Sequence, residues 1–207
     1  MNVGIKQQPY YDEKGFDVYI YDEEHRMFGV FDGMGTSEGA RGAANLAATK
    51  FFQVRANGLD AGGLGAVIDE VSKSVAVHFP TDGTTAVVAR VDSDGRLHYA
   101  SVGDSRLYVL KDGRVKQMTA DEGVGNRLLN YCGPYTHGCC QIGVLDADQW
   151  DTFMMCSDGI TGDWKDQLLS DIDIETVLNE YKPQDAAQKL YQLSKKDDDK
   201  TVIVVGK

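Results

Sequence analysis

Aspartates at the ends of apolar strands restrict the fold of this chain more than any other feature of its sequence. Asp32 follows the apolar run 28–31, and one serine separates Asp158 from the run 153–156. Carboxylates are rare in strands and costly to bury, so such a set indicates a positive group that compensates their charge. The divalent cations Mg²⁺ and Mn²⁺ are natural candidates, since they prefer carboxylate, carbonyl and water oxygens. The set comprises Asp17, Asp32, Asp104, Asp158 and Asp198.

Glycine directly follows Asp32 and Asp158. Because it lacks a Cβ, Gly33 lets the backbone bend sharply and bring its carbonyl to a cation that Asp32 also contacts. An Asp-Gly dipeptide is equally typical of a turn, and the residues by themselves leave both interpretations open here. For Asp94-Gly95 and Asp112-Gly113, which lie between strand-like segments, we expect hairpin turns.

Strands are expected where apolar, β-branched and aromatic residues cluster between turn signals. These segments are 17–21, 27–31, 84–91, 97–102, 107–111, 152–156 and 201–205. Helices are expected where apolar residues recur at helical spacing or a proline stands at the first helical position. These segments are 38–55, 62–77, 174–181 and 184–194.

The order of the segments is strands, two helices, a run of strands, two helices and a last strand. This order is neither a βαβ alternation nor an all-β pattern, so we expect an antiparallel sheet core with helices packed outside. The 207 residues suffice for one sizeable core, and no repeat or linker divides them. Residues 1–207 are therefore expected to form a single α+β domain.

Charge and composition exclude several classes of partner and site. With 21 Lys and Arg against 32 Asp and Glu, the net charge is −11, so neither nucleic acid nor an anionic membrane is an expected partner. No apolar run approaches the roughly 18 residues of a membrane span and no targeting signal is visible, which favours the cytoplasm. The four histidines are scattered. The cysteines expected to be reduced packing residues are Cys132, Cys139, Cys140 and Cys156.

Seven short motifs occur in an order that resembles the metal-dependent serine/threonine protein phosphatases of type 2C, the PPM family. Each motif is weak by itself, but their order over nearly the whole chain is specific. They are the Asp-Gly motif in 28–35, Gly83-Thr84-Thr85-Ala86, the Val-Gly-Asp-Ser-Arg segment in 102–110, Asp112-Gly113, and the segments 118–122, 156–159 and 198–201.

The resemblance implies an α-β-β-α sandwich of two antiparallel sheets flanked by helices, with a metal site at one edge. Asp32 would bridge two Mn²⁺ or Mg²⁺ ions, and Gly33 would give its carbonyl to one of them. Asp158 and Asp198 would complete the other. Asp32, Asp158 and Asp198 are thus the expected catalytic set.

Further positions follow from the same resemblance. Asp17 would hold metal-bound water, while Asp104, with Asp158, matches the positions of a third, weaker metal in many bacterial members. Arg106 is expected to pair with nearby carboxylates. The connection 122–156 is short, which implies a small bacterial-type member with a shortened flap over an open site.

The implied activity is hydrolysis of phosphoserine and phosphothreonine in proteins. Two cations about 3.5–4 Å apart activate a shared water and neutralise charge on the phosphoryl oxygens, so no protein nucleophile is needed. The expected partners are phosphorylated proteins and a cognate serine/threonine kinase.

Three positions depart from the family pattern. Asp12 stands where the family usually carries an arginine that grips the substrate phosphate, and Lys6 or Lys14 is the expected substitute, as a point charge. Phe16 replaces a frequent Glu. Met34 replaces a His that would protonate the leaving group, although Met at this position also resembles sporulation-type and stress-regulator phosphatases of the same superfamily.

Two other functions stay open because of these departures. One is a pseudophosphatase, inactive or weakly active, that uses the sandwich as a binding or regulatory module. The other is a phosphatase of small molecules. Against the first, an inactive relative has no chemical need to keep three mutually repelling carboxylates.

Overall fold

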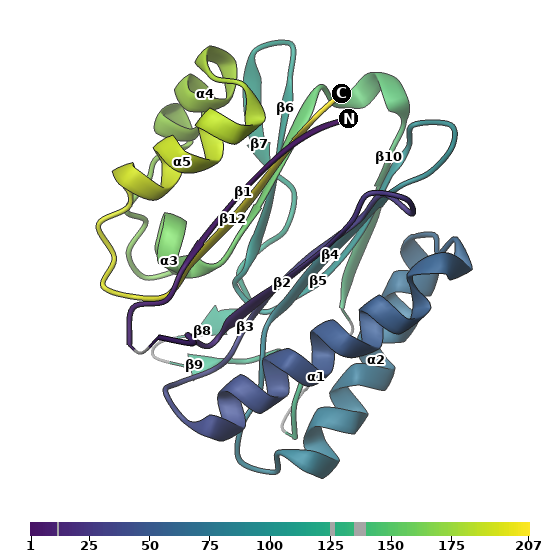
Figure 1. Cartoon of the computed structure of the whole chain (residues 1–207), viewed down its shortest axis with the longest axis vertical. Helices are drawn as coiled ribbons and strands as arrows, with labels where there is room; N and C mark the ends of the chain where they lie inside the picture. Colours follow the sequence, from purple (N-terminus) through teal and green to yellow (C-terminus); the bar gives the residue numbers. More distant parts are fainter. Residues whose placement is uncertain (12, 125–126, 135–139) are drawn as a thin grey trace.

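Two antiparallel β-sheets stack face to face, and helices cover the outer face of each (Figure 1). The computed structural model describes residues 1–11, 13–124, 127–134 and 140–207. In these residues the strand order is β1-β12-β11-β6-β7 in the first sheet and β10-β5-β4-β3-β2 in the second. The strands are β1 (Asn2–Gln8), β2 (Asp17–Asp22), β3 (Met27–Asp32), β4 (Ala86–Val91), β5 (Leu97–Val102), β6 (Arg106–Lys111), β7 (Arg114–Gln117), β10 (Gln141–Leu145), β11 (Thr152–Cys156) and β12 (Lys200–Gly206).

Two pairs of helices form the outer layers. The first pair packs on the second sheet and the other pair on the first sheet. Capping side chains mark their starts: Ser37 and Ser170 each accept a backbone N–H of the helix that follows, and Pro183 occupies a first helical turn. The helices are α1 (Glu38–Val54), α2 (Ala61–His78), α4 (Asp171–Glu180) and α5 (Pro183–Leu193). The short elements are η1 (Arg55–Asn57), η2 (Ala147–Gln149), α3 (Asp158–Thr161), β8 (Gly123–Val124) and β9 (Arg127–Leu128).

The core lies in three layers because side chains of a strand alternate between its two faces. In β11, Phe153 and Met155 point between the sheets, while Met154 and Cys156 point toward α4 and α5. Strand β12 alternates in the same way, which explains why its run 202–205 is apolar and buried on both faces. This architecture confirms the expected α-β-β-α sandwich.

The segments expected from apolar runs are confirmed, with ends shifted by a few residues. Both Asp-Gly hairpins are also confirmed: β4 pairs with β5 and β6 pairs with β7. In the second turn Asp112 and Gly113 both have positive φ, as a two-residue hairpin turn with the twist of the strands requires. Cys132 and Cys156 are buried as expected, Cys140 is partly buried, and Cys139 lies outside the described residues.

Several short or polar elements were not expected. Strand β1 alternates weakly in hydrophobicity and is held by pairing with β12 and packing against α5. Strands β7 and β10 are sheet edges with one exposed face, and β8, β9 and α3 have four residues or fewer. The connection expected to be short therefore carries a small hairpin and the edge strand β10. None of the helices in the described ranges has the length and apolar character that crossing a bilayer requires.

Antiparallel pairing gathers the aspartates at one end of the sandwich. Because neighbouring strands run in opposite directions, the start of one lies beside the end of the next. The register pairs Asp17, at the start of β2, with Asp32, at the end of β3. In the first sheet, the end of β11 and the start of β12 meet at this same end, which brings Asp158 near Asp198.

Replacing Phe153 by Ala removes a fully buried ring that contacts Phe28 and Trp150 between the sheets. We expect a loss of about 3–5 kcal/mol in the free energy of unfolding, measured by urea titration. The control Ile172→Ala changes a side chain that is 75% exposed on α4 and should stay within about 0.5 kcal/mol of wild type. Equal effects of the two substitutions would contradict the layer assignment.

Candidate functional site

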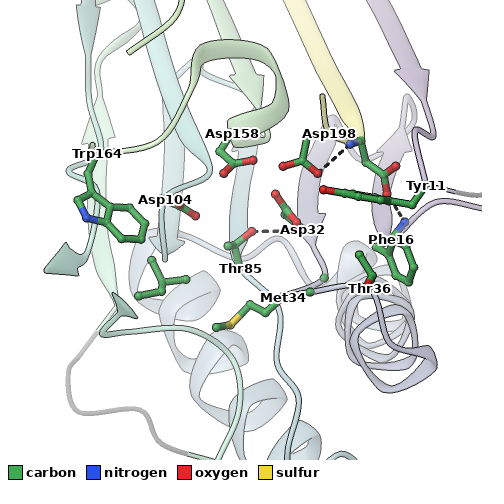
Figure 2. A pocket seen from close by; sticks show the side chains of 14 residues that line it. Tyr11, Phe16, Asp32, Met34, Thr36, Thr85, Asp104, Asp158, Trp164 and Asp198 are labelled. Carbon is green, nitrogen blue, oxygen red and sulfur yellow. Dashed lines mark hydrogen bonds between the residues drawn. The ribbon is translucent and has the colours of Figure 1, made fainter. Parts of the chain in front are cut away.

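A cavity of about 260 Å³ opens at the aspartate end of the sandwich (Figure 2). Its walls come from both sheets, from the loop before β2 and from the segment after β3. Figure 2 shows Asp32, Asp158 and Asp198 directed toward one another in its centre. The lining residues are Tyr11, Phe16, Asp32, Gly33, Met34, Gly35, Thr36, Thr85, Asp104, Leu128, Asp158, Trp164, Asp198 and Asp199.

The backbone of Asp32 is fixed by two neighbouring threonines. The backbone N–H of Asp32 donates to Oγ1 of Thr85 over 3.0 Å, while its carbonyl accepts from Oγ1 of Thr84 over 2.9 Å and from the N–H of Thr85 over 2.8 Å. Both threonines are buried. The Gly-Thr-Thr-Ala motif therefore serves to hold the first Asp-Gly motif in place.

Asp17 lies deeper than Asp32 and is 5% exposed. Its Oδ2 accepts from the Ser157 hydroxyl over 2.7 Å, while Oδ1 is buried with no hydrogen-bond partner. Burial raises the pKa of Asp17 to about 7, although the bond from Ser157 acts in the opposite direction. An orphaned buried carboxylate oxygen of this kind is a group that a cation or an ordered water would satisfy.

The other carboxylates repel one another in the same region. Burial, followed by the charges of Asp17, Asp158 and Asp104, raises the pKa of Asp32 well above its usual range. Burial and then the charge of Asp158 raise the pKa of Asp104 to about 7. Burial also raises the pKa of Asp158. These groups favour a state in which either protons or cations neutralise them.

Lys196 supplies a positive charge to this cluster. Its Nζ donates to Oδ2 of Asp158 and lies 3.0 Å from Oδ2 of Asp198. Burial opposes the charged form, but the two ion pairs outweigh it and raise the pKa of Lys196 above its ordinary value. The lysine thus bridges the two aspartates that were expected to complete one metal site.

A metal ion needs suitable donor atoms in a suitable arrangement. Carboxylate oxygens, together with the Gly33 carbonyl, are a donor set that suits Mn²⁺ or Mg²⁺ by chemistry. Among the described residues, however, no three or more His, Cys, Asp or Glu side chains stand ready to hold a metal ion. Since Lys196 bridges Asp158 and Asp198, metal binding requires its side chain to move away from them.

Gly33 and the residues beside it shape the cavity wall. A Cβ at Gly33 would lie 2.7 Å from the Ala40 carbonyl oxygen, so the chain passes α1 too closely for any side chain. Met34 lines the cavity with a thioether, which has no proton to give. Phe16 is buried beneath the guanidinium of Arg41, with 4.6 Å between the Arg41 Cζ and the ring centroid.

The lysines expected to grip phosphate lie elsewhere. Lys6 on β1 places its Nζ over the ring of Tyr191 on α5, 5.1 Å from the centroid, outside the cavity. The alternation of β1 turns Lys6 toward α5, and its contact with substrate phosphate stays a prediction. Lys14 lines a separate cavity beside Asp17, and Asp12 lies outside the described residues. Arg106 pairs with both oxygens of Asp121 as expected, over 2.9 and 2.6 Å.

Sequence reasoning missed the lysine and much of the cavity wall. Lys196 lies two residues before Asp198, and that proximity is the signal that could have identified it. Asp199 is buried and accepts the backbone N–H groups of Tyr10 and Phe16, so it anchors the loop that carries Tyr11 into the site. Trp164 and Tyr11 carry no motif and meet the aspartates only through the fold.

Comparison with known proteins gives one family and a set of related folds. The model of the family described as stage II sporulation protein E (SpoIIE) matches residues 22–207. The crystal structure of a bacterial serine phosphatase has a TM-score of 0.83 and 20% identity, covering 100% of this chain and 97% of that one. Serine/threonine phosphatase Stp1 from Staphylococcus aureus has a TM-score of 0.83 and 19% identity, with 100% and 95% covered.

A further structure bears on metals. PstP from Mycobacterium tuberculosis has a TM-score of 0.76 and 19% identity, with 98% and 96% covered. A PstP catalytic domain has also been solved in complex with two manganese ions. No curated protein matches the sequence. At these identities the structural likenesses show a common fold.

The raised pKa values predict an unusual pH dependence for the metal-free protein. Burial raises the pKa of Asp17 and of Asp104 from the ordinary 3.8 to about 7, so the folded state binds more protons between these limits. Their stabilising contribution is present below about pH 4 and is lost as the pH rises through 7. We therefore expect the free energy of unfolding to increase when the pH falls from 8 to 5.5.

The variant Asp104→Asn removes one of these charges. It should stabilise the metal-free protein at pH 8 by about 1–3 kcal/mol, because one pKa unit corresponds to about 1.4 kcal/mol, and its gain should shrink at pH 5.5. Urea unfolding at both pH values measures this. Asp148→Asn, at an exposed position, should change neither value. Destabilisation by Asp104→Asn at pH 8 would contradict the repulsion argument.

Proposed function

The chain belongs to the SpoIIE family, and from this premise we propose that it is a metal-dependent phosphatase that hydrolyses phosphoserine and phosphothreonine in proteins. The observation that carries the proposal is the convergence of Asp32, Asp158 and Asp198 on one cavity, where burial and neighbouring carboxylates raise the pKa of Asp32 and Asp158. A site that concentrates several carboxylates at one cavity is suited to divalent cations.

Two Mn²⁺ or Mg²⁺ ions are the proposed cofactors. Asp32 and the Gly33 carbonyl would hold one ion, and Asp158 and Asp198 the other, with Asp32 shared between them. Asp104, beside Asp158, would hold a third, weaker ion. When bound, the cations supply an activated water and neutralise charge on the phosphoryl oxygens.

Residues of the chain perform the remaining tasks. Asp17 lies behind Asp32 with one oxygen fixed by Ser157 and the other available, which suits it to orient a water of the metal shell. The threonines at 84 and 85 keep Asp32 in place. Because Met34 cannot donate a proton, the leaving alkoxide would take its proton from solvent that enters the open cavity.

Binding of the substrate phosphate depends on groups other than those of the usual family pattern. In the described part of the chain, neither Lys nor Arg lines the cavity, and Lys196 reaches it only through its pairs with Asp158 and Asp198. The cations would therefore provide most of the attraction for phosphate. We propose that the substrates are phosphorylated proteins of the cytoplasm, supplied by a cognate serine/threonine kinase.

One observation favours a second candidate function. Lys196 neutralises Asp158 and Asp198 without any metal, which is what a non-catalytic binding module would need to keep its fold. The pseudophosphatase hypothesis therefore stays as the alternative, and both a turnover assay and a metal titration discriminate it from the enzyme.

The assay uses a phosphothreonine peptide with Mn²⁺. We expect release of phosphate that EDTA abolishes and that Asp32→Asn or Asp158→Asn lowers by about 100-fold or more, because each variant removes a charged metal ligand. Asp197→Asn, an exposed neighbour of Asp198, serves as the matched control and should retain activity. Hydrolysis that survives chelation would contradict the proposal.

A metal titration tests the displacement of Lys196. Lys196→Met should raise the affinity for Mn²⁺ by about tenfold, because an ion pair that competes with the metal is lost, and should lower the melting temperature of the metal-free protein at pH 8. Calorimetry and thermal unfolding measure the two effects. Lys195→Met, at the exposed neighbouring position, should alter neither. Weaker Mn²⁺ binding in Lys196→Met would show that the lysine assists the metal.

A further inference from the structure

A second cavity, of about 270 Å³, lies at the opposite end of the second sheet from the aspartates. The turn between β2 and β3, the segment after α1 and the end of β4 enclose it. Strand β3 joins the two ends of the sheet and is six residues long, so about 20 Å separate the cavities. The lining residues are Glu24, His25, Arg26, Arg55, Ala56, Gly58, Arg90, Val91 and Ser93, and we call this the basic pocket.

Three of the eight arginines in this acidic chain line the basic pocket, and they come from three separate segments. Arg55 is held in place because its Nε donates to Asp22 over 2.6 Å and its guanidinium stacks on Phe52 at 3.9 Å. Arg26 and Arg90, in the described part of the chain, donate to the backbone carbonyls of Asp92 and Leu59. Neither of these two guanidinium groups is neutralised by a carboxylate.

The Nε–H of Arg90 is the strongest indication of a ligand. This donor is buried and has no hydrogen-bond partner among the residues that the structure describes, while Nη1 of the same guanidinium donates to the Leu59 carbonyl over 3.1 Å. Leaving a charged donor buried and unpaired is unfavourable, so such groups in native proteins usually meet a water, an ion or a ligand. An acceptor placed in the basic pocket would satisfy it.

The backbone at Arg26 adds an independent observation. Its φ is +50°, in the left-handed region that Gly or Asn adopts more readily than Arg. The Arg26 carbonyl accepts the N–H of Val91 over 3.0 Å, which ties the β2–β3 turn to the end of β4. An arginine kept in a strained conformation beside a cavity is a pattern found at binding sites.

Acidic residues near the basic pocket are engaged with other partners. Asp22 accepts from Arg55 and also from the backbone N–H and ring of His25. Asp92 faces His98 and accepts two backbone N–H groups of its own turn. Glu24 is on the lining and is exposed to solvent, where water screens its charge. The lining therefore keeps an excess of positive charge.

We propose that the basic pocket binds a phosphate group, either as free phosphate or as part of a phosphorylated peptide. Guanidinium groups present paired N–H donors that match phosphate oxygens. Three segments of the chain each bring one such group to the pocket. Its volume is close to that of the aspartate cavity. The proposal does not depend on the activity assigned to the aspartates, because the two sites share no residue.

The experiment uses the whole chain with divalent cations removed. Without cations the aspartate cavity repels phosphate, so it does not contribute to the binding that is measured. Inorganic phosphate is titrated while ¹H–¹⁵N spectra record the Nε–H signals of the arginines. We expect a saturable shift of the Arg90 Nε–H signal. Each of Arg90→Met and Arg26→Gly should weaken binding by about tenfold, because each removes a charged hydrogen-bonding group.

Two variants separate binding from folding. Arg26→Gly relieves the positive φ, so its melting temperature should equal or exceed that of wild type, whereas its affinity for phosphate should be about tenfold lower. Arg96→Met removes an arginine that is 50% exposed, pairs with Asp146 and lies outside the basic pocket, and should bind phosphate like wild type. An unshifted Arg90 signal, or equal binding by Arg26→Gly and Arg96→Met, would overturn the proposal.

A parallel titration identifies the source of the phosphate group. A phosphothreonine peptide is compared with free phosphate and with the unphosphorylated peptide on the same metal-free protein. Tighter binding of the phosphopeptide than of free phosphate assigns the site to phosphorylated chains, and equal binding assigns it to the free anion. Binding of the unphosphorylated peptide with equal affinity would contradict phosphate recognition.

Discussion

Mutual repulsion among desolvated carboxylates is the constraint that organises one end of this sandwich. Asp17, Asp32, Asp104 and Asp158 lie where burial disfavours their charge, and the charges of the other three raise the pKa of Asp32 further. Since a fold is stable by only a small margin, this repulsion has to be offset nearby. Ser157 donates to Asp17, and the Lys196 ammonium joins Asp158 to Asp198. The strain is thus localised at the cavity, and the apolar layers behind it stay free of charge.

Charge is separated along the strands of the second sheet. Strand β3 runs from the arginine end, beside Arg26, to the aspartate end at Asp32, and β4 runs back between Thr85 and Arg90. The net charge of −11 hides this polarity, because three arginines lie at one end of the sheet and the buried aspartates at the other. A phosphorylated partner approaching the protein would meet attraction at one end and, without metals, repulsion at the other.

Patterns among residues that are close in the sequence determine how much of the fold and of the candidate site could be predicted. Asp32, Asp158 and Asp198 were placed together because strand ends and Asp-Gly pairs are visible in the sequence, and all three line one cavity. The position of Lys6 over Tyr191 could not be predicted, because a weakly patterned strand does not reveal which face meets α5. Arg90 gives no signal because the Leu59 carbonyl that it contacts lies 31 residues away. Lys196 is signalled only by its closeness to Asp198, since its other partner, Asp158, lies 38 residues away. Sequence motifs therefore identify a set of aspartates more readily than the cations that the fold brings close to a site.

The pairing of β1 with β12 sets the order in which the site is assembled. Residues 200–206 form β12 inside the first sheet, between β1 and β11, and Asp199 just before it fastens the loop of Tyr10 and Phe16. During synthesis β1 therefore lacks its partner strand β12 until almost the whole sequence has left the ribosome. Closing such a long-range contact is slow, and the waiting strands are exposed to mispairing. Asp198 and Asp199, directly before β12, consequently reach their places at the cavity only when this late pairing is made.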